Sequence, residues 1–192
     1  KMVAMAVPAM AAAGDYEITV ENTNDAMSIN GKTYYAYKVF NLTLGAETTE
    51  GDTTTYGAYA YSINSSDWAF EKLTTGATTD SDTGVITTTY GIVLTPSAAD
   101  PTTYSVDGST MTDANARSLA DALQSVLPAT TNADGSAVGA SEKAVISLSE
   151  GGWYAVYGVV IPTDPKADPA EEVVAAVGLT TTDKKVTVKP KA

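Results

Sequence analysis

The sequence contains no histidine and no cysteine among its 192 residues. These absences exclude Ser-His-Asp and Cys-His nucleophile pairs, metal sites built on imidazole or thiolate, and disulfide bonds. Positive charge is also scarce, because 11 Lys and Arg stand against 23 Asp and Glu, for a net charge of −12. A surface of that sign repels phosphate groups, which disfavours nucleic-acid binding. We therefore expect no cofactor, no metal and no enzyme, but a binding or structural module.

The N-terminus has the pattern of a secretory signal. Lys1 is followed by an apolar run rich in Ala and Met, and Ala11 and Ala13 form the small-residue pattern of a cleavage site. The run is too short to span a bilayer, which takes about 20 residues. We interpret residues 1–13 as a signal-peptide remnant of a secreted protein and 14–192 as one domain. The alternative is a buried apolar strand or helix at the N-terminus.

From Asp15 onward the hydrophobic pattern has the period of two that is typical of strands. In YEITVE (16–21) apolar and polar residues alternate. Asn30-Gly31 favours a type I′ turn, which predicts a hairpin over 28–44. Further strands are expected at 56–63, 85–94, 144–148, 153–161, 172–178 and 185–189, with Thr-rich loops at 47–55 and 74–84. This spacing predicts an all-β fold: an Ig-like antiparallel β-sandwich with one or two short flanking helices.

Two segments have helical spacing instead. Ser66 is a candidate cap for a short helix that includes Trp68 and ends near Leu73. Thr112 is a stronger candidate, because the apolar positions of the following 15 residues or so recur at the interval of an amphipathic helix, which Pro128 ends. We expect this second helix to lie on the flank of the sandwich.

Four stretches, taken in order, resemble the N-terminal domains of sortase-assembled Gram-positive pilins. They are GKTYYAYKVFNLTL (31–44), NARSLADALQSVL (115–127), EGGWYAVYGVV (150–160) and VTVKPKA (186–192). The resemblance implies a structural subunit of a surface pilus attached to the cell wall. Its implied partners are other pilin subunits and a pilus-specific sortase.

The resemblance also implies that a lysine near the C-terminus joins subunits. In that family, sortase holds one subunit as a thioester, and the lysine of the next subunit's pilin motif attacks it. In this sequence that lysine is Lys191, after Pro190, but Lys189 occupies the usual aromatic position and is its main rival; Lys184 and Lys185 are further rivals. The alternative is a solvated basic strand end. The motif normally closes the first domain, so we expect further domains after it.

An internal isopeptide bond is a second feature of the family. Lys38 is the candidate amine, Asp183 the candidate acceptor and Glu150 the candidate proton donor. Burial would favour the neutral amine and the protonated acid that such a bond requires. In a regular strand Lys38 shares a face with Tyr34, Ala36, Phe40 and Leu42, yet the opposite face is apolar too, so the pattern leaves the buried face open. The alternative is a lysine that extends its amine to solvent.

Other functions remain open from the sequence. The domain is alternatively an adhesin module of a surface fibre that binds host protein or glycan, since tyrosine-rich strands suit a sugar-binding face. A glycosidase or other carboxylate enzyme is a third hypothesis, although no acid–base pair stands out. Asp80–Gly84 and Asn132–Gly135 space their oxygens as calcium loops do, but neither has the closing Glu, and we interpret both as turns.

Overall fold

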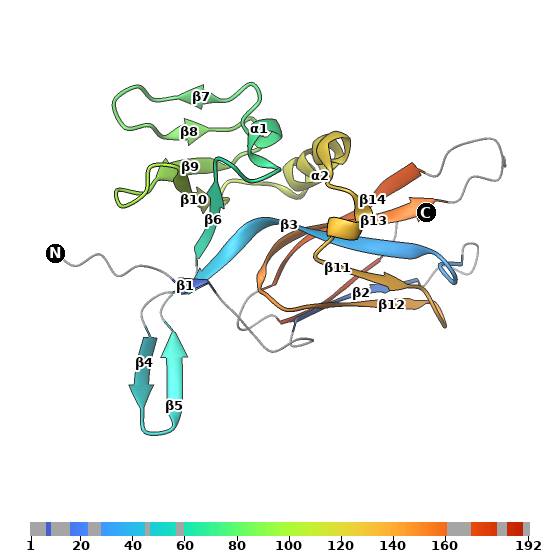
Figure 1. Cartoon of the computed structure of the whole chain (residues 1–192). Helices are drawn as coiled ribbons and strands as arrows, with labels where there is room; N and C mark the ends of the chain where they lie inside the picture. Colours follow the sequence, from blue (N-terminus) through green and yellow to red (C-terminus); the bar gives the residue numbers. More distant parts are fainter. Residues whose placement is uncertain are drawn as a thin grey trace.

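The computed structural model describes residues 7–8, 16–22, 28–44, 47–56, 60–160, 170–179 and 184–189. Strands dominate these residues, and two short helices lie on one side of them (Figure 1). The predicted all-β antiparallel sandwich with flanking helices is confirmed. Among the helices described, none is long and apolar enough to cross a membrane.

The sandwich has two layers that face each other across one core. The first layer contains, in spatial order, β14 (Ala170–Leu179), β13 (Gly152–Val160), β3 (Thr33–Leu44) and β11 (Gly135–Val138). The second contains β12 (Lys143–Leu148), β2 (Tyr16–Glu21) and β15 (Lys185–Val188). β2 is antiparallel to β12 and parallel to β15.

The first sheet continues beyond the sandwich, because β6 pairs with the far end of β3. This extension forms the green upper part of Figure 1. Its strands are β6 (Ala60–Asn64), β10 (Thr103–Asp107), β9 (Val93–Pro96), β8 (Ile86–Thr87) and β7 (Thr78–Thr79). The remaining elements are β1 (Val7–Pro8), which pairs with β3, the hairpin β4 (Glu47–Glu50) and β5 (Thr53–Tyr56), helices α1 (Phe70–Leu73) and α2 (Asp113–Leu123), and the 3-10 turns η1 (Gln124–Val126) and η2 (Thr130–Asn132).

Two apolar clusters lie on opposite faces of β3 and β13. The inner cluster fills the sandwich and takes residues such as Ile18, Tyr34 and Ile146 from both layers. The outer cluster lies between the first sheet and the helices, with Leu119 and Leu123 of α2 fully buried in it. The confirmed alternation follows from this layering, because buried residues alternate with partly exposed ones in β2 and with exposed ones in β12.

A bulge in β3 interrupts the expected regular strand. Phe40 pairs with Trp153 but Lys38 pairs with Tyr154, so Val39 is an additional residue in β3. As a result Val39 and Phe40 both belong to the outer cluster, and Lys38 faces inward beside Tyr154. The expected common face of Lys38 and Phe40 was therefore wrong, since the prediction assumed unbroken alternation.

The predicted turn at Asn30-Gly31 is present, but the predicted hairpin is not. The N–H of Lys32 donates to the carbonyl of Ile29 at 3.1 Å, and Gly31 has φ of +78°. Asn30 has no positive φ, so the turn is type II rather than the predicted type I′, which requires positive φ at both positions. β3 pairs at this end with β11, from over 100 residues later, which a local turn signal does not reveal.

Several other local predictions were wrong. The Thr-rich stretch 47–55 contains the β4–β5 hairpin, and the expected strand 85–94 is divided into β8 and β9 by a turn at Thr88–Gly91. The short helix begins after Ala69 rather than Ser66. Strands β10 and β11 lie in stretches for which no strand was predicted. All of these elements are short, and the strands among them are stabilised by their pairing and packing more than by their own sequence.

Candidate functional site

Lys38 and Glu150 meet at one end of the inner cluster. Lys38 comes from the bulged part of β3, and Glu150 lies in the connection between β12 and β13. The ammonium Nζ of Lys38 is in direct contact with Glu150 Oε2, and the two side chains are 20% and 31% exposed. The structure therefore places the two predicted residues in one ion pair, half-withdrawn from solvent.

Gly152, the first residue of β13, leaves the space that this ion pair requires. A Cβ at Gly152 would lie 2.7 Å from the carbonyl oxygen of Phe40 and 3.0 Å from Cδ of Lys38, so the lysine stem passes where only glycine leaves space. The hydroxyl of Tyr154 donates to the main-chain carbonyl of Glu150 at 2.7 Å, which fixes the connection that carries the carboxylate.

Burial raises the pKa of the Tyr154 phenol, and the negative charges of Asp134 and Glu150 raise it further. The phenol is therefore protonated at neutral pH. Because it stays neutral, Tyr154 acts as a permanent hydrogen-bond donor to the Glu150 connection and not as an acid or base.

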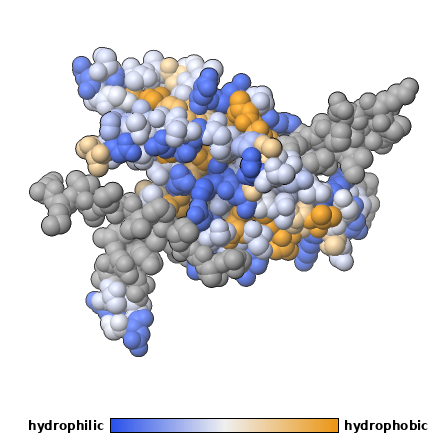
Figure 2. All heavy atoms as spheres, viewed as in Figure 1, coloured by the Kyte–Doolittle hydropathy of each residue, from blue (hydrophilic) through white to orange (hydrophobic). Residues whose placement is uncertain are grey.

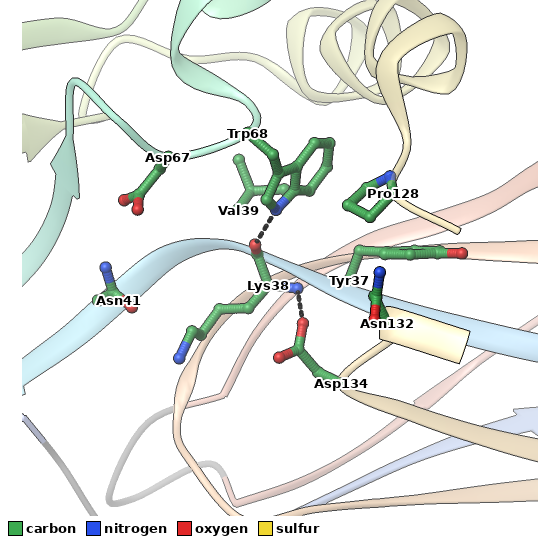
Figure 3. Close-up of a pocket in the computed structure, with 9 residues that line it drawn as sticks. All are labelled: Tyr37, Lys38, Val39, Asn41, Asp67, Trp68, Pro128, Asn132 and Asp134. Atoms are coloured by element: carbon green, nitrogen blue, oxygen red, sulfur yellow. Dashed lines mark hydrogen bonds between the residues drawn. The ribbon is translucent and has the colours of Figure 1, made fainter. Parts of the chain in front are cut away.

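Two side chains bond the main chain of Lys38 at the edge of β3 that faces away from β13. Neither β11 nor β6 reaches this part of β3, because β11 pairs up to Ala36 and β6 begins at Asn41. In their place Asp134 Oδ2 accepts from the N–H of Lys38 at 2.6 Å. The indole Nε1 of Trp68 donates to the carbonyl of Lys38 at 3.1 Å (Figure 3). Two side chains thus satisfy the peptide groups that a strand would otherwise pair.

A hollow of about 320 Å³ opens at this gap in the strand pairing. We call it the Trp68 hollow. Figure 2 shows hydrophilic side chains gathered in the middle of the molecule, where β3 passes below α1, and Figure 3 shows the residues that line the hollow there. Its polar lining consists of Lys38, Asn41, Asp67, Asn132 and Asp134.

The other predicted site residues are placed only in part. Asp183, Pro190 and Lys191 lie outside the described residues. Lys189 is exposed directly after the end of β15. Lys184 and Lys185 are exposed too, and Nζ of Lys185 lies 3.8 Å from Glu17 Oε1 on the neighbouring strand.

Sequence reasoning missed three residues of this site. Asp134 was interpreted as part of a turn, Trp68 as part of a short helix and Tyr154 as part of a strand. The sequence does show two polar groups of neighbours: Trp68 follows Asp67, and Asn132 lies two residues before Asp134. Nothing in the sequence indicates that the two loops meet over the same strand.

Metal-binding chemistry has little support at the site. Within the part of the chain that the structure describes, no group of three or more acidic side chains is arranged to hold a metal ion.

Comparisons with models of known families, with curated proteins and with solved structures find no match to this chain.

Proposed function

We propose that the chain is a structural domain of a covalently polymerised cell-surface pilus, secreted and attached to the cell wall. The observation that carries this proposal is the position of β15, an outer strand of the three-stranded sheet that ends at Val188, directly before the exposed Lys189. Pro190 follows, and since proline has no N–H it cannot extend the pairing. We propose that the chain departs from the sheet after Lys189 and presents Lys191, or Lys189, to an enzyme.

The proposed linkage is an amide formed at this lysine. A sortase holds the preceding subunit as a thioester, and the neutral lysine amine attacks the thioester carbonyl. The C–N bond forms, the C–S bond breaks, the sortase thiol leaves, and the amine gives up its proton to a base. A solvated lysine has a pKa of about 10.4, so the sortase must favour the neutral amine.

Transpeptidation with a pilus-specific sortase tests the proposal. The chain is incubated with the sortase and a donor peptide that ends in Leu-Pro-x-Thr-Gly, and the ligated product is located by peptide mass spectrometry. We expect ligation at Lys191, its loss in Lys191→Ala and its retention in Lys185→Ala, the control at an exposed lysine of β15. Ligation that survives in the double variant Lys189→Ala/Lys191→Ala, or no ligation at all, contradicts the proposal.

We further propose that Lys38 forms an internal amide with Asp183, with Glu150 as the proton carrier. The contact between Lys38 and Glu150 and the buried Tyr154, which pairs with Lys38, support this reaction. Nζ attacks the Asp183 carboxyl carbon, the amide forms and one water leaves. Intact mass of the purified chain is expected to be lower by one water, and Lys38→Ala is expected to restore the full calculated mass. A wild-type mass without that loss contradicts the bond and leaves the pilus proposal standing.

A further inference from the structure

We propose that the Trp68 hollow binds one ring of a neutral saccharide. The hollow lies where no strand pairs with one edge of β3, between the end of β11 and the start of β6. Its volume of about 320 Å³ lies at the lower end of the range for small-molecule sites, which suits a single sugar ring. The proposal does not depend on pilus assembly.

The lining offers donors and acceptors in pairs. Figure 3 shows Asn41 and Asp67 on one side of Trp68, and Asn132 and Asp134 on the other. Each pair combines a carboxamide, which both donates and accepts, with a carboxylate, which accepts. A sugar hydroxyl also donates and accepts, so adjacent hydroxyls of one ring match such a pair.

The carboxylates keep capacity for a ligand. Oδ2 of Asp67 accepts the N–H of Asn64 at 2.8 Å, and Oδ2 of Asp134 accepts the N–H of Lys38 at 2.6 Å. For the residues that the structure describes, no hydrogen bond is recorded at Oδ1 of either residue. Because a main-chain bond already orients each carboxylate, a ligand that bonds its other oxygen pays a lower entropy cost of binding.

Trp68 and Pro128 supply the apolar surface that the C–H face of a sugar ring requires. The indole is fixed by its bond to the Lys38 carbonyl and by an edge contact with Tyr37, whose ring centroid is 6.1 Å away. A large aromatic that is already immobilised gives contact area without further ordering. The rings of Trp68 and Pro128 lie above β3 in Figure 3, across from Asp134.

The charges of the hollow select against other ligands. Asp67 and Asp134 repel phosphates and acidic sugars, and the ammonium of Lys38 is engaged by Glu150. A calcium ion takes six to eight oxygen ligands, usually with several carboxylates, whereas this hollow has two carboxylates and a neighbouring lysine. A neutral polyhydroxylated ring is the ligand class that this lining fits.

Titration of the ¹⁵N-labelled chain with methyl glycosides of galactose, glucose, mannose and N-acetylglucosamine tests the inference. We expect at least one glycoside to cause saturable shifts of the Trp68 indole N–H, the Asn132 side-chain amide and the Lys38 amide at millimolar concentration. Methyl sialoside, which carries a carboxylate, is expected to cause none.

Two variants separate binding from folding. Asn132→Ala removes one donor from the hollow and is expected to weaken binding at least fivefold. Thr131→Ala changes the preceding residue of the same exposed turn, does not line the hollow, and is expected to leave binding unchanged. The inference is overturned if no glycoside gives saturable shifts, if both variants bind equally well, or if CaCl₂ alone reproduces the shifts and the glycosides do not.

Discussion

At the scale of the residue, Glu142 shows how one side chain organises a loop. Its carboxylate accepts from the amide of Asn22 at 2.7 Å, the hydroxyl of Ser28 and the N–H of Ile29 at 3.1 Å. Glu142 itself has φ of +60°, a conformation that costs free energy in a non-glycine residue. The three bonds from a segment more than 100 residues away offset that cost.

We expect acid to release this contact. The bonds from Ser28, Asn22 and Ile29 hold the pKa of Glu142 below its ordinary value. A lowered folded-state pKa contributes stability that is complete above the unfolded-state pKa of about 4.3 and is lost as the pH falls through the folded-state value. Urea midpoints measured from pH 6 to pH 3 should therefore fall more for the wild type than for Glu142→Gln. Parallel curves for the two proteins would show that Glu142 does not carry the effect.

At the scale of the element, α2 is the helix that the sequence predicts best. Thr112 accepts from the N–H of Asn115 at 3.1 Å, as its predicted role as N-cap requires. Thr112→Ala is expected to lower the free energy of unfolding by about 1 kcal/mol, since one N–H of the first turn loses its partner. Thr112→Ser keeps the hydroxyl and should remain close to wild type in the same urea titration. Equal losses in the two variants would point to the methyl group instead of the cap.

The sequence does not show where two main-chain segments approach each other closely. A Cβ at Gly139 would lie 2.1 Å from the carbonyl oxygen of Ile29, where two backbones touch. We expect Gly139→Ala to lower the free energy of unfolding by about 3 kcal/mol, because neither main chain can move aside without breaking pairs of β3 and β11. Gly108→Ala, whose nearest neighbour is a flexible methionine 3.8 Å away, should change it by less than about 0.5 kcal/mol. Thermal unfolding of both variants distinguishes these cases.

The contrast between α2 and β11 shows which elements can be predicted from the sequence and which cannot. Thr112 and the apolar spacing act within one helix, so the element and its cap are legible locally. The predicted end at Pro128 was wrong, because the α-helix ends at Leu123 and the chain continues as the 3-10 turn η1 to Val126. The strands with clean alternation, β2 and β12, are legible for the same reason. β11 is only four residues long, Gly-Ser-Ala-Val, and pairs with β3. Gly135 lets it pass close to Ile146 and Leu148 of β12, and Gly139 lets the following chain touch Ile29, and neither contact is visible in the local sequence. The candidate site depends on that pairing: Lys38 and Glu150 were named from the sequence, whereas Asp134 reaches Lys38 only through β11.

At the scale of the whole molecule, two cores share the same central strands. Tyr34 and Tyr154 enter the inner cluster, whereas Tyr37 and Trp153, on the same two strands, enter the outer one. β3 and β13 therefore cannot lose one face without disturbing the other. We infer that the sandwich and its helical flank unfold as one cooperative unit.

A substitution in the inner core, observed from the outer core, tests this coupling. Both tryptophans belong to the outer cluster or pack against it, so fluorescence reports on that side. Ile146 is fully buried in the inner cluster, and Ile146→Ala is expected to lower the free energy of unfolding by about 2–5 kcal/mol. If the cores are coupled, the fluorescence midpoint in urea falls together with the far-ultraviolet dichroism midpoint. Val145→Ala, on the exposed face of the same strand, should leave both midpoints in place. A fluorescence midpoint that stays at the wild-type value in Ile146→Ala while the dichroism midpoint falls would instead show two independent units, each with its own stability.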